Sequence, residues 1–360
     1  MNTRLRLAVL VALCSPLALA ADRGAGQEVV VVTNERSGDV TVLDAATLKV
    51  VATVPVGKRP RGLMASGDGK TLFVALSGSP IKGPPKLDAA GRPILDEDKD
   101  DDADKAADGI GIVDLQALKF QRKLSTGSDP EALAVTRDGR TLYVTNEDVA
   151  TLSVVDVASG EVRHIVPVRP EPEGVTISPD GRHVWATCET NGEVVVVDAA
   201  TAKPVAEIRV GGRPRTVAFL PDGSAAFVPS ETTGQVHEVD AVTFKVRRTI
   251  KLPAGARPMG TAVSPDGARL FVGTGRGGTV LAIDTKSAEV VGQVKAGTRP
   301  WGVALSADGR RLFAANGPSN DVSVIDAATM KEIARVPAGQ SPWGVTLVTR
   351  PAPVAAPAQK

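Results

Sequence analysis

A unit of about 42 residues recurs along the chain and limits what it can fold into. An aspartate that closes a β-rich run appears once per unit, at spacings of 70, 42, 42, 42, 44 and 42 residues. The long first interval is a 42-residue unit that carries 28 extra residues. A proline recurs in step, so the chain contains seven units. The aspartates are Asp44, Asp114, Asp156, Asp198, Asp240, Asp284 and Asp326, and the prolines are Pro60, Pro130, Pro172, Pro214, Pro258, Pro300 and Pro342.

The unit at 297–339 shows the pattern of one repeat. Residues 302–306 alternate apolar and small side chains as an inner strand, and 311–315 follow after a tight Asp-Gly hairpin. Residues 321–326 and 331–337 supply a third and an outer strand. Four antiparallel strands in about 42 residues are typical of one propeller blade. The sequence therefore predicts an all-β, seven-bladed β-propeller with four antiparallel strands per blade.

The two ends of the chain should complete one blade together. The N-terminal region supplies three strands, at 29–33, 39–44 and 49–55, while 342–348 is an inner strand without partners. Pairing these segments closes the ring, which removes exposed sheet edges and holds the termini in place.

The first residues have the features of a secretory signal peptide. Arg4 and Arg6 form a short basic segment, 7–19 is an apolar run, and Ala-Leu-Ala at 18–20 supplies a small-x-small cleavage site. The run is too short to span a bilayer, and no later segment approaches the roughly 20 apolar residues that a membrane helix needs. We therefore expect a soluble protein that is exported to the periplasm.

Removal of this segment leaves a nearly neutral chain with one cysteine. Two of the 42 basic side chains are lost, so 40 remain against 41 acidic ones. Net charge therefore provides no attraction to nucleic acid or to anionic membranes, and nucleic acid is not expected as a partner. Cys188 cannot form an internal disulfide, so stability must come from packing, and we expect a small packed residue rather than a nucleophile there. We expect a monomer.

One unit carries an acidic insertion. The predicted organisation is a signal peptide at 1–20, a propeller at 21–349 with an insertion at 79–108, and a disordered tail at 350–360 that is rich in proline and alanine. Within the insertion, 96–108 is intensely acidic, and repulsion between like charges favours disorder there. A docking segment for a basic partner, or a lid over the channel, is the alternative.

Residues that repeat in every unit indicate scaffold, whereas positions that differ between units can form an asymmetric site. The seven aspartates precede turns, where a carboxylate accepts amide hydrogens, so we expect a structural role for them. The residue after each proline should face one mouth of the channel, and there the units differ. Around the ring these residues are Arg61, Glu131, Glu173, Arg215, Met259, Trp301 and Trp343, and those before the proline include Arg59, Asp129, Glu171, Arg213, Arg257 and Arg299.

This predicted mouth is charged, partly aromatic and asymmetric, as recognition of a polar or anionic small molecule requires. The alternative is structural: Arg61 pairs with Glu131 across the channel. Arg215 would pair with Glu173 in the same way, and the tryptophans would plug the funnel. The predicted ligand-binding residues are Arg61, Glu131, Glu173, Arg215, Arg257, Arg299, Trp301 and Trp343.

A second layer of carboxylates follows the second strands of four units. Such a layer could bind a hard cation or a cationic partner, although solvated charges at the rim are the simpler interpretation. Its members are Glu35, Glu147, Glu189 and Glu231, and the unit that carries the insertion has Ser77 instead.

The motif Tyr-Val-Thr-Asn at 143–146 marks a resemblance to a known family. It is the motif that names the YVTN family of β-propeller repeats, and the resemblance covers nearly the whole mature chain. The stretches 34–62, 130–148 and 316–344 resemble the branch found beside quinoprotein alcohol oxidation systems in bacteria. The resemblance implies a periplasmic accessory or binding role in a pathway that depends on pyrroloquinoline quinone (PQQ), with a redox or quinoprotein partner. It carries no agreed catalytic residues.

The positions of the histidines favour a binding protein over an enzyme. His164, His183 and His237 fall in an outer strand, at the start of a second strand and in a third strand, away from the predicted mouth. This argues against histidine-ligated zinc, haem or histidine base catalysis there, and we expect neither a cofactor nor a metal. The rival function is a propeller lactonase or other hydrolase at the same mouth, in which Glu131 and Glu173 could act with a metal.

Overall fold

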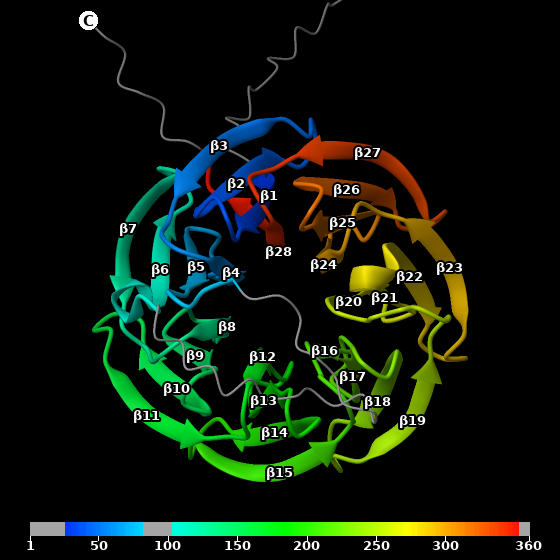
Figure 1. The fold of residues 1–360 in the computed structure, drawn as a ribbon, viewed down its shortest axis with the longest axis horizontal. Coiled ribbons are helices and arrows are strands. Elements are labelled where there is room, and N and C mark those ends of the chain that lie inside the picture. The colour runs from blue at the N-terminus through cyan, green and yellow to red at the C-terminus, as the bar shows by residue number, and fades with distance from the viewer. Residues whose placement is uncertain (1–25, 82–102, 353–360) are drawn as a thin grey trace, which may run out of the picture.

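Seven four-stranded antiparallel sheets are arranged around a central channel (Figure 1). The computed structural model describes residues 26–81 and 103–352. Each sheet is one blade, and its strands run from the channel to the rim in the order inner, second, third and outer. This confirms the predicted seven-bladed propeller. The signal peptide predicted at 1–20, residues 82–102 of the insertion predicted at 79–108, and the predicted tail from 353 onward lie outside the described residues. The disorder expected over 96–108 does not extend to Asp108, which is buried and accepts hydrogen bonds from the backbone N–H groups of Gly78 and Asp129.

The strands are assigned to the blades as follows. Blade one consists of β4 (Pro60–Ala65), β5 (Thr71–Leu76), β6 (Gly109–Asp114) and β7 (Lys119–Leu124). Blade two consists of β8 (Pro130–Val135), β9 (Thr141–Asn146), β10 (Thr151–Asp156) and β11 (Val162–Pro167). Blade three consists of β12 (Pro172–Ile177), β13 (His183–Cys188), β14 (Glu193–Asp198) and β15 (Lys203–Arg209). Blade four consists of β16 (Ala218–Phe219), β17 (Ala225–Ser230), β18 (Gln235–Asp240) and β19 (Val246–Lys251).

Blade five consists of β20 (Thr261–Val263), β21 (Arg269–Gly273), β22 (Thr279–Asp284) and β23 (Val290–Lys295). Blade six consists of β24 (Pro300–Leu305), β25 (Arg311–Asn316), β26 (Asp321–Asp326) and β27 (Lys331–Pro337). Blade seven consists of β28 (Pro342–Arg350), β1 (Gln27–Asn34), β2 (Asp39–Asp44) and β3 (Val50–Pro55). Two single turns of 3-10 helix, η1 (Lys105–Ala107) and η2 (Gly275–Gly277), lie in loops. Among the described residues no helix is long and apolar enough to cross a membrane.

Blade seven is completed by both ends of the chain, as predicted. β28 pairs antiparallel with β1, from Gln27 opposite Arg350 to Asn34 opposite Pro342. The predicted tail began at residue 350, and the structure corrects this boundary. Arg350 is buried, and its guanidinium donates hydrogen bonds to the side-chain oxygen of Gln27 and to the carbonyl oxygen of Leu115. These bonds extend the strand beyond its predicted end.

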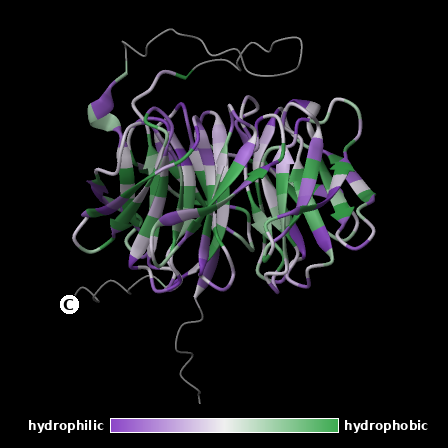
Figure 2. Cartoon of the chain, turned by 90° about the horizontal axis from the view of Figure 1, so that it is seen from below, coloured by the Kyte–Doolittle hydropathy of each residue, from purple (hydrophilic) through white to green (hydrophobic). Residues whose placement is uncertain are grey.

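Apolar side chains between neighbouring blades form the core. The third residue of the second strand is aromatic in six blades and almost fully buried, and each of these rings packs in a cluster shared with the next blade. Burial of such rings supplies much of the energy that holds the blades together. Figure 2 shows the disc from the side, with hydrophilic residues frequent in the loops of both faces. The six residues are Phe73, Tyr143, Trp185, Phe227, Phe271 and Phe313.

The repeated aspartates are confirmed as turn residues. Asp326 accepts hydrogen bonds from the backbone amide and the hydroxyl of Thr329, at 2.8 and 2.7 Å. All seven make such a bond to an amide two or three residues further on. These bonds hold the pKa of Asp326 below its usual value, because they stabilise the charged form. The carboxylates of the seven aspartates are therefore used for hydrogen bonds within the turns of the scaffold.

Candidate functional site

The two predicted layers of polar residues lie at one end of the channel. Inner and second strands are antiparallel, so the start of one lies beside the end of the other: Pro130 lies opposite Asn146, and Pro172 opposite Cys188. The residues around each proline therefore meet those that follow the second strands. We call this end the channel mouth. It comprises Arg59, Arg61, Asp129, Glu131, Glu171, Glu173, Arg213, Arg215, Arg257, Met259, Arg299, Trp301 and Trp343, together with Glu35, Glu147, Glu189 and Glu231.

Arg215 forms the centre of one buried ion cluster. Its guanidinium lies 2.7 Å from a carboxylate oxygen of Glu173 and 2.5 Å from one of Glu231, and it also contacts Glu189. Arg213 adds a second contact to Glu189. Burial alone would raise the pKa of Glu173, but the charge of Arg215 and of neighbouring arginines lowers it to about 2. For Glu189 burial prevails, and its pKa lies well above the usual value.

Arg61 and Arg59, at the start of blade one, form a second cluster. Blades two and three lie between this cluster and Arg215, which belongs to blade four. Arg61 contacts the fully buried carboxylate of Glu131 and lies 3.5 Å from that of Glu35. Arg59 lies 3.2 Å from Glu35 and 3.7 Å from Asp129. Together with the contact between Arg215 and Glu173, these contacts confirm both ion pairs expected in the structural alternative. Four of the predicted ligand-binding residues are thus neutralised by one another.

The carboxylate layer is not a set of solvated rim charges, and that prediction was wrong. Glu35, Glu189 and Glu231 are each less than a tenth exposed. They are buried because arginines compensate their charge, which removes most of the cost of leaving water. These arginines come from the next blade for Glu35 and Glu189, and from the same blade for Glu231.

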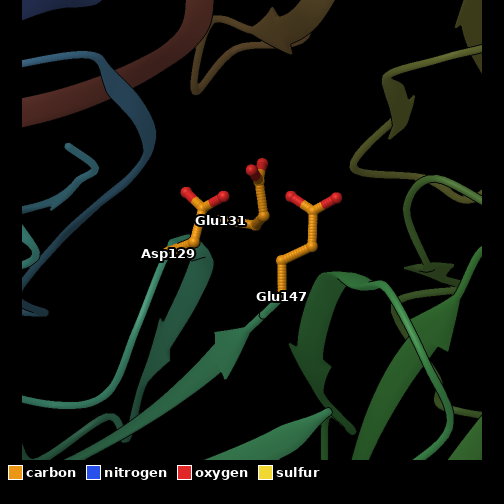
Figure 3. A group of neighbouring side chains, drawn as sticks. All are labelled: Asp129, Glu131 and Glu147. Carbon is orange, nitrogen blue, oxygen red and sulfur yellow. The ribbon is translucent and has the colours of Figure 1, made fainter. Parts of the chain in front are cut away.

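Glu147 is the member of this layer without an ion pair among the described residues. Its carboxylate points toward those of Asp129 and Glu131, and the ligand atoms of the three lie within 4.8 Å of one another (Figure 3). Burial, and then the charges of Asp129 and Glu173, raise the pKa of Glu147 to about 7. Three carboxylates in this arrangement could hold a cation, but Arg59 and Arg61 already neutralise two of them. Burial and the neighbouring carboxylates therefore favour the protonated form of Glu147 more than that of an ordinary glutamate.

Trp301 and Trp343 form an aromatic pair on the remaining side of the mouth. Their ring centroids are 5.5 Å apart and their planes are inclined by 35°. Arg61 lies over Trp343 at 5.2 Å, and Arg299 lies over Trp301 at 4.4 Å. The indole of Trp301 lies above Gly317, where a Cβ atom would come within 3.3 Å of Nε1. Both indoles are partly exposed, so the pair forms a surface that a flat molecule can contact.

Arg299 differs from the arginines that occupy its position in other blades. Arg59 and Arg213 pair with the carboxylate that follows the second strand of the preceding blade, which is Glu35 or Glu189. For Arg299 that position holds Gly275, and Arg299 makes no ion pair with any described residue. Burial and the like charge of Arg276 lower the pKa of Arg299, as expected for an uncompensated cation. Arg257, by contrast, donates to the carbonyl oxygen of Thr232.

The three histidines lie away from the channel mouth, as predicted, whereas Cys188 ends β13 next to Glu189 and is a packed core residue, also as predicted. His164 is in β11, His183 begins β13, and His237 is in β18. Cys188 is fully buried among apolar side chains, and burial raises the pKa of its thiol to about 12. A thiol with that pKa is not a nucleophile at neutral pH.

Sequence reasoning missed the cations that continue outward from Arg299. Arg276, Lys295 and Arg335 lie along a groove between blades five and six. The sequence did contain an indication that the arginines of blades five and six lack carboxylate partners. Gly275 and Gly317 stand at the positions where four other blades have glutamate.

Comparisons with known proteins support the fold. The profile of the cytochrome D1 heme domain family matches residues 222–357. Among the curated proteins, none matches the sequence. Three solved structures illustrate the likeness. Hydrazine synthase of Kuenenia stuttgartiensis is 22% identical with a TM-score of 0.66, over 80% of this chain and 89% of that one.

The second structure is a dihydro-heme d1 dehydrogenase in complex with DHE, 17% identical with a TM-score of 0.61, over 88% of this chain and 74% of that one. The third is a candidate 6-phosphogluconolactonase from Bacteroides fragilis NCTC 9343, 16% identical with a TM-score of 0.71, over 90% of this chain and 98% of that one. Identities this low establish a shared architecture and no shared ligand. The chain is a seven-bladed β-propeller protein.

Proposed function

We propose that the protein is an exported binding protein that holds a small planar anion at the channel mouth. Its place would be a periplasmic pathway of PQQ-dependent alcohol oxidation, as the resemblance implies, with a quinoprotein as partner. The observation that carries the proposal is the pair of partly exposed indoles beside Arg299, a cation that has no carboxylate partner among the described residues. Aromatic planes and an unpaired guanidinium are what recognition of such an anion requires.

Two other arginines of the mouth are already engaged by the scaffold. Arg61 and Arg215 are held by carboxylates of the scaffold, so they are not available as receptors without breaking buried ion pairs. Trp343 adds a donor, because its buried indole N–H has no acceptor among the described residues. An oxygen of the ligand would satisfy that donor.

Alanine at Trp301 or Trp343 is expected to weaken the binding of PQQ by about tenfold or more, as for aromatic residues at the centre of an interface. Isothermal titration calorimetry is the suitable measurement, because it does not depend on the tryptophans as reporters. Trp185→Phe is the matched control: this tryptophan lies in the core of blades three and four, and its replacement should leave affinity unchanged. Unfolding midpoints should show that Trp301→Ala and Trp343→Ala remain folded. Absence of PQQ binding, or binding that survives both alanine changes, would contradict the proposal.

A lactonase or other hydrolase is the second candidate, favoured by the group of Asp129, Glu131 and Glu147, whose ligand atoms lie within 4.8 Å of one another and in which the pKa of Glu147 is raised to about 7. A carboxylate with this pKa is suited to act as a general base, and it is active once deprotonated. Hydrolysis of a simple lactone such as glucono-δ-lactone should then rise with pH through about 7. Glu147→Gln should lower the rate by about a hundredfold. A rate equal to that of buffer would exclude this function while leaving the binding function in place.

A further inference from the structure

A basic groove leads from the channel mouth to the rim between blades five and six. It encloses about 920 Å³ and is lined by η2, by the ends of β23 and β27, and by the loop that enters β24. Four cations line this groove, and none of the described residues along it is acidic. We call it the blade 5–6 groove. Its cations are Arg276, Lys295, Arg299 and Arg335.

The scaffold does not compensate most of this positive charge. Arg335 pairs with Glu332 at 2.8 Å, but Arg276, Lys295 and Arg299 form no ion pair within 26–81 or 103–352. Arg276 lies near enough to Arg299 for their charges to repel, as the lowered pKa of Arg299 indicates. Neighbouring like charges without a counter-charge attract an anion from solution.

The guanidinium of Arg299 contacts only the face of Trp301, and its N–H groups have no acceptor among the described residues. Arg59 and Arg213 occupy the same position in other blades, and carboxylates of the scaffold bind both of them. The donors of Arg299 therefore remain open to an anion from solution.

We propose that the blade 5–6 groove binds further anionic groups of the same ligand, which therefore carries at least two carboxylate or phosphate groups. The flat part of the ligand would lie on Trp301 and Trp343 with one anionic group at Arg299. A second anionic group would extend outward to Arg276 and Lys295. The inference rests on the proposed function, because it extends that ligand from the mouth into the groove. The volume of the groove is in the range of small-molecule sites.

The test compares three probes on the whole protein by isothermal titration calorimetry: benzoate, benzene-1,3,5-tricarboxylate and inorganic pyrophosphate. The tricarboxylate should bind at least about tenfold more tightly than benzoate, because it gains charge-assisted hydrogen bonds in the groove. Lys295→Gln and Arg276→Gln should each remove most of that advantage and leave benzoate unchanged. Lys251→Gln is the matched control, since Lys251 ends β19 in blade four as Lys295 ends β23. It should leave all three affinities unchanged.

The outcomes separate the two proposals. If benzoate and the tricarboxylate bind equally, or if Lys295→Gln and Arg276→Gln change neither, the groove is not a subsite, while binding that depends on Trp301 would still support the proposed function. If only pyrophosphate binds and requires Lys295, the groove is an oxyanion site and the aromatic ligand is wrong. Tighter binding of pyrophosphate than of the tricarboxylate would assign the anionic groups as phosphate. Binding of none of the probes would overturn the inference.

Discussion

Replacing Arg215 with methionine is expected to lower the free energy of unfolding by about 3–5 kcal/mol, the usual cost of breaking a buried ion pair. The change removes one cation and leaves Glu173, Glu189 and Glu231 close together in a buried site. Their mutual repulsion and incomplete hydration then act on the folded state alone. Urea unfolding followed by circular dichroism measures the effect.

The matched control for this prediction is Arg209→Met. The side chain of Arg209 is 81% exposed and lies 3.4 Å from Glu193, so the loss of this surface pair should change the free energy of unfolding by less than about 1 kcal/mol. Adding Glu231→Gln to Arg215→Met should recover part of the loss, because Arg215 holds the pKa of Glu231 below its usual value and the buried charge left without this partner is then absent. Equal effects of Arg215→Met and Arg209→Met would show that the cluster does not stabilise the fold.

Deletion of residues 342–360 is expected to abolish cooperative unfolding. The deletion removes β28, which supplies the inner strand of blade seven and places Val345 and Val348 in the cores shared with blades six and one. β1 would then expose an unpaired edge along the channel, and the ring would be open. Thermal unfolding by circular dichroism should change from one sharp transition to a broad one at much lower temperature.

Deletion of 353–360 alone is the control for this truncation, and it should leave the transition unchanged because β28 remains complete. A peptide of residues 341–352, added to the shortened protein, should restore the sharp transition by occupying the vacant place beside β1. A truncated protein that unfolds as sharply as the full chain would mean that the ring does not depend on closure by both termini.

Much of the fold could be predicted because its information is local. Spacings of 42 residues, Asp-Gly hairpins and alternating strands are read directly along the chain, and strands such as 321–326 and 331–337 agree with the structure to the residue. The inner strands were predicted less well. β24 begins at Pro300 rather than at residue 302, because the pairing with β25 continues across a bulge between Pro300 and Val303. At such a bulge the alternation of apolar and small residues along the sequence is interrupted, although the hydrogen-bonded pairing of the two strands continues.

The candidate site could be predicted only in part. The positions where the units disagree were identified from the repeat, and the structure brings them together at one mouth. The sequence could not show which of these side chains lack an ion-pair partner, because the partners come from other blades. Arg59 reaches the carboxylate of Glu35, whereas the equivalent position near Arg299 holds Gly275, which has no side chain to pair with it. The solvated interpretation of Glu189 failed for the same reason, since its partners come from blade four.

The amino-acid sequence by itself determined the number of blades, their strand order and the residues that can differ around the channel. It does so because hairpins and strand alternation depend on neighbours within a few residues. The tertiary structure alone decided which charges are neutralised and which have no partner among the described residues. Most ion pairs at the mouth join residues of different blades that are 24 or more positions apart in sequence, and their formation depends on distances of a few ångströms that only the closed ring sets.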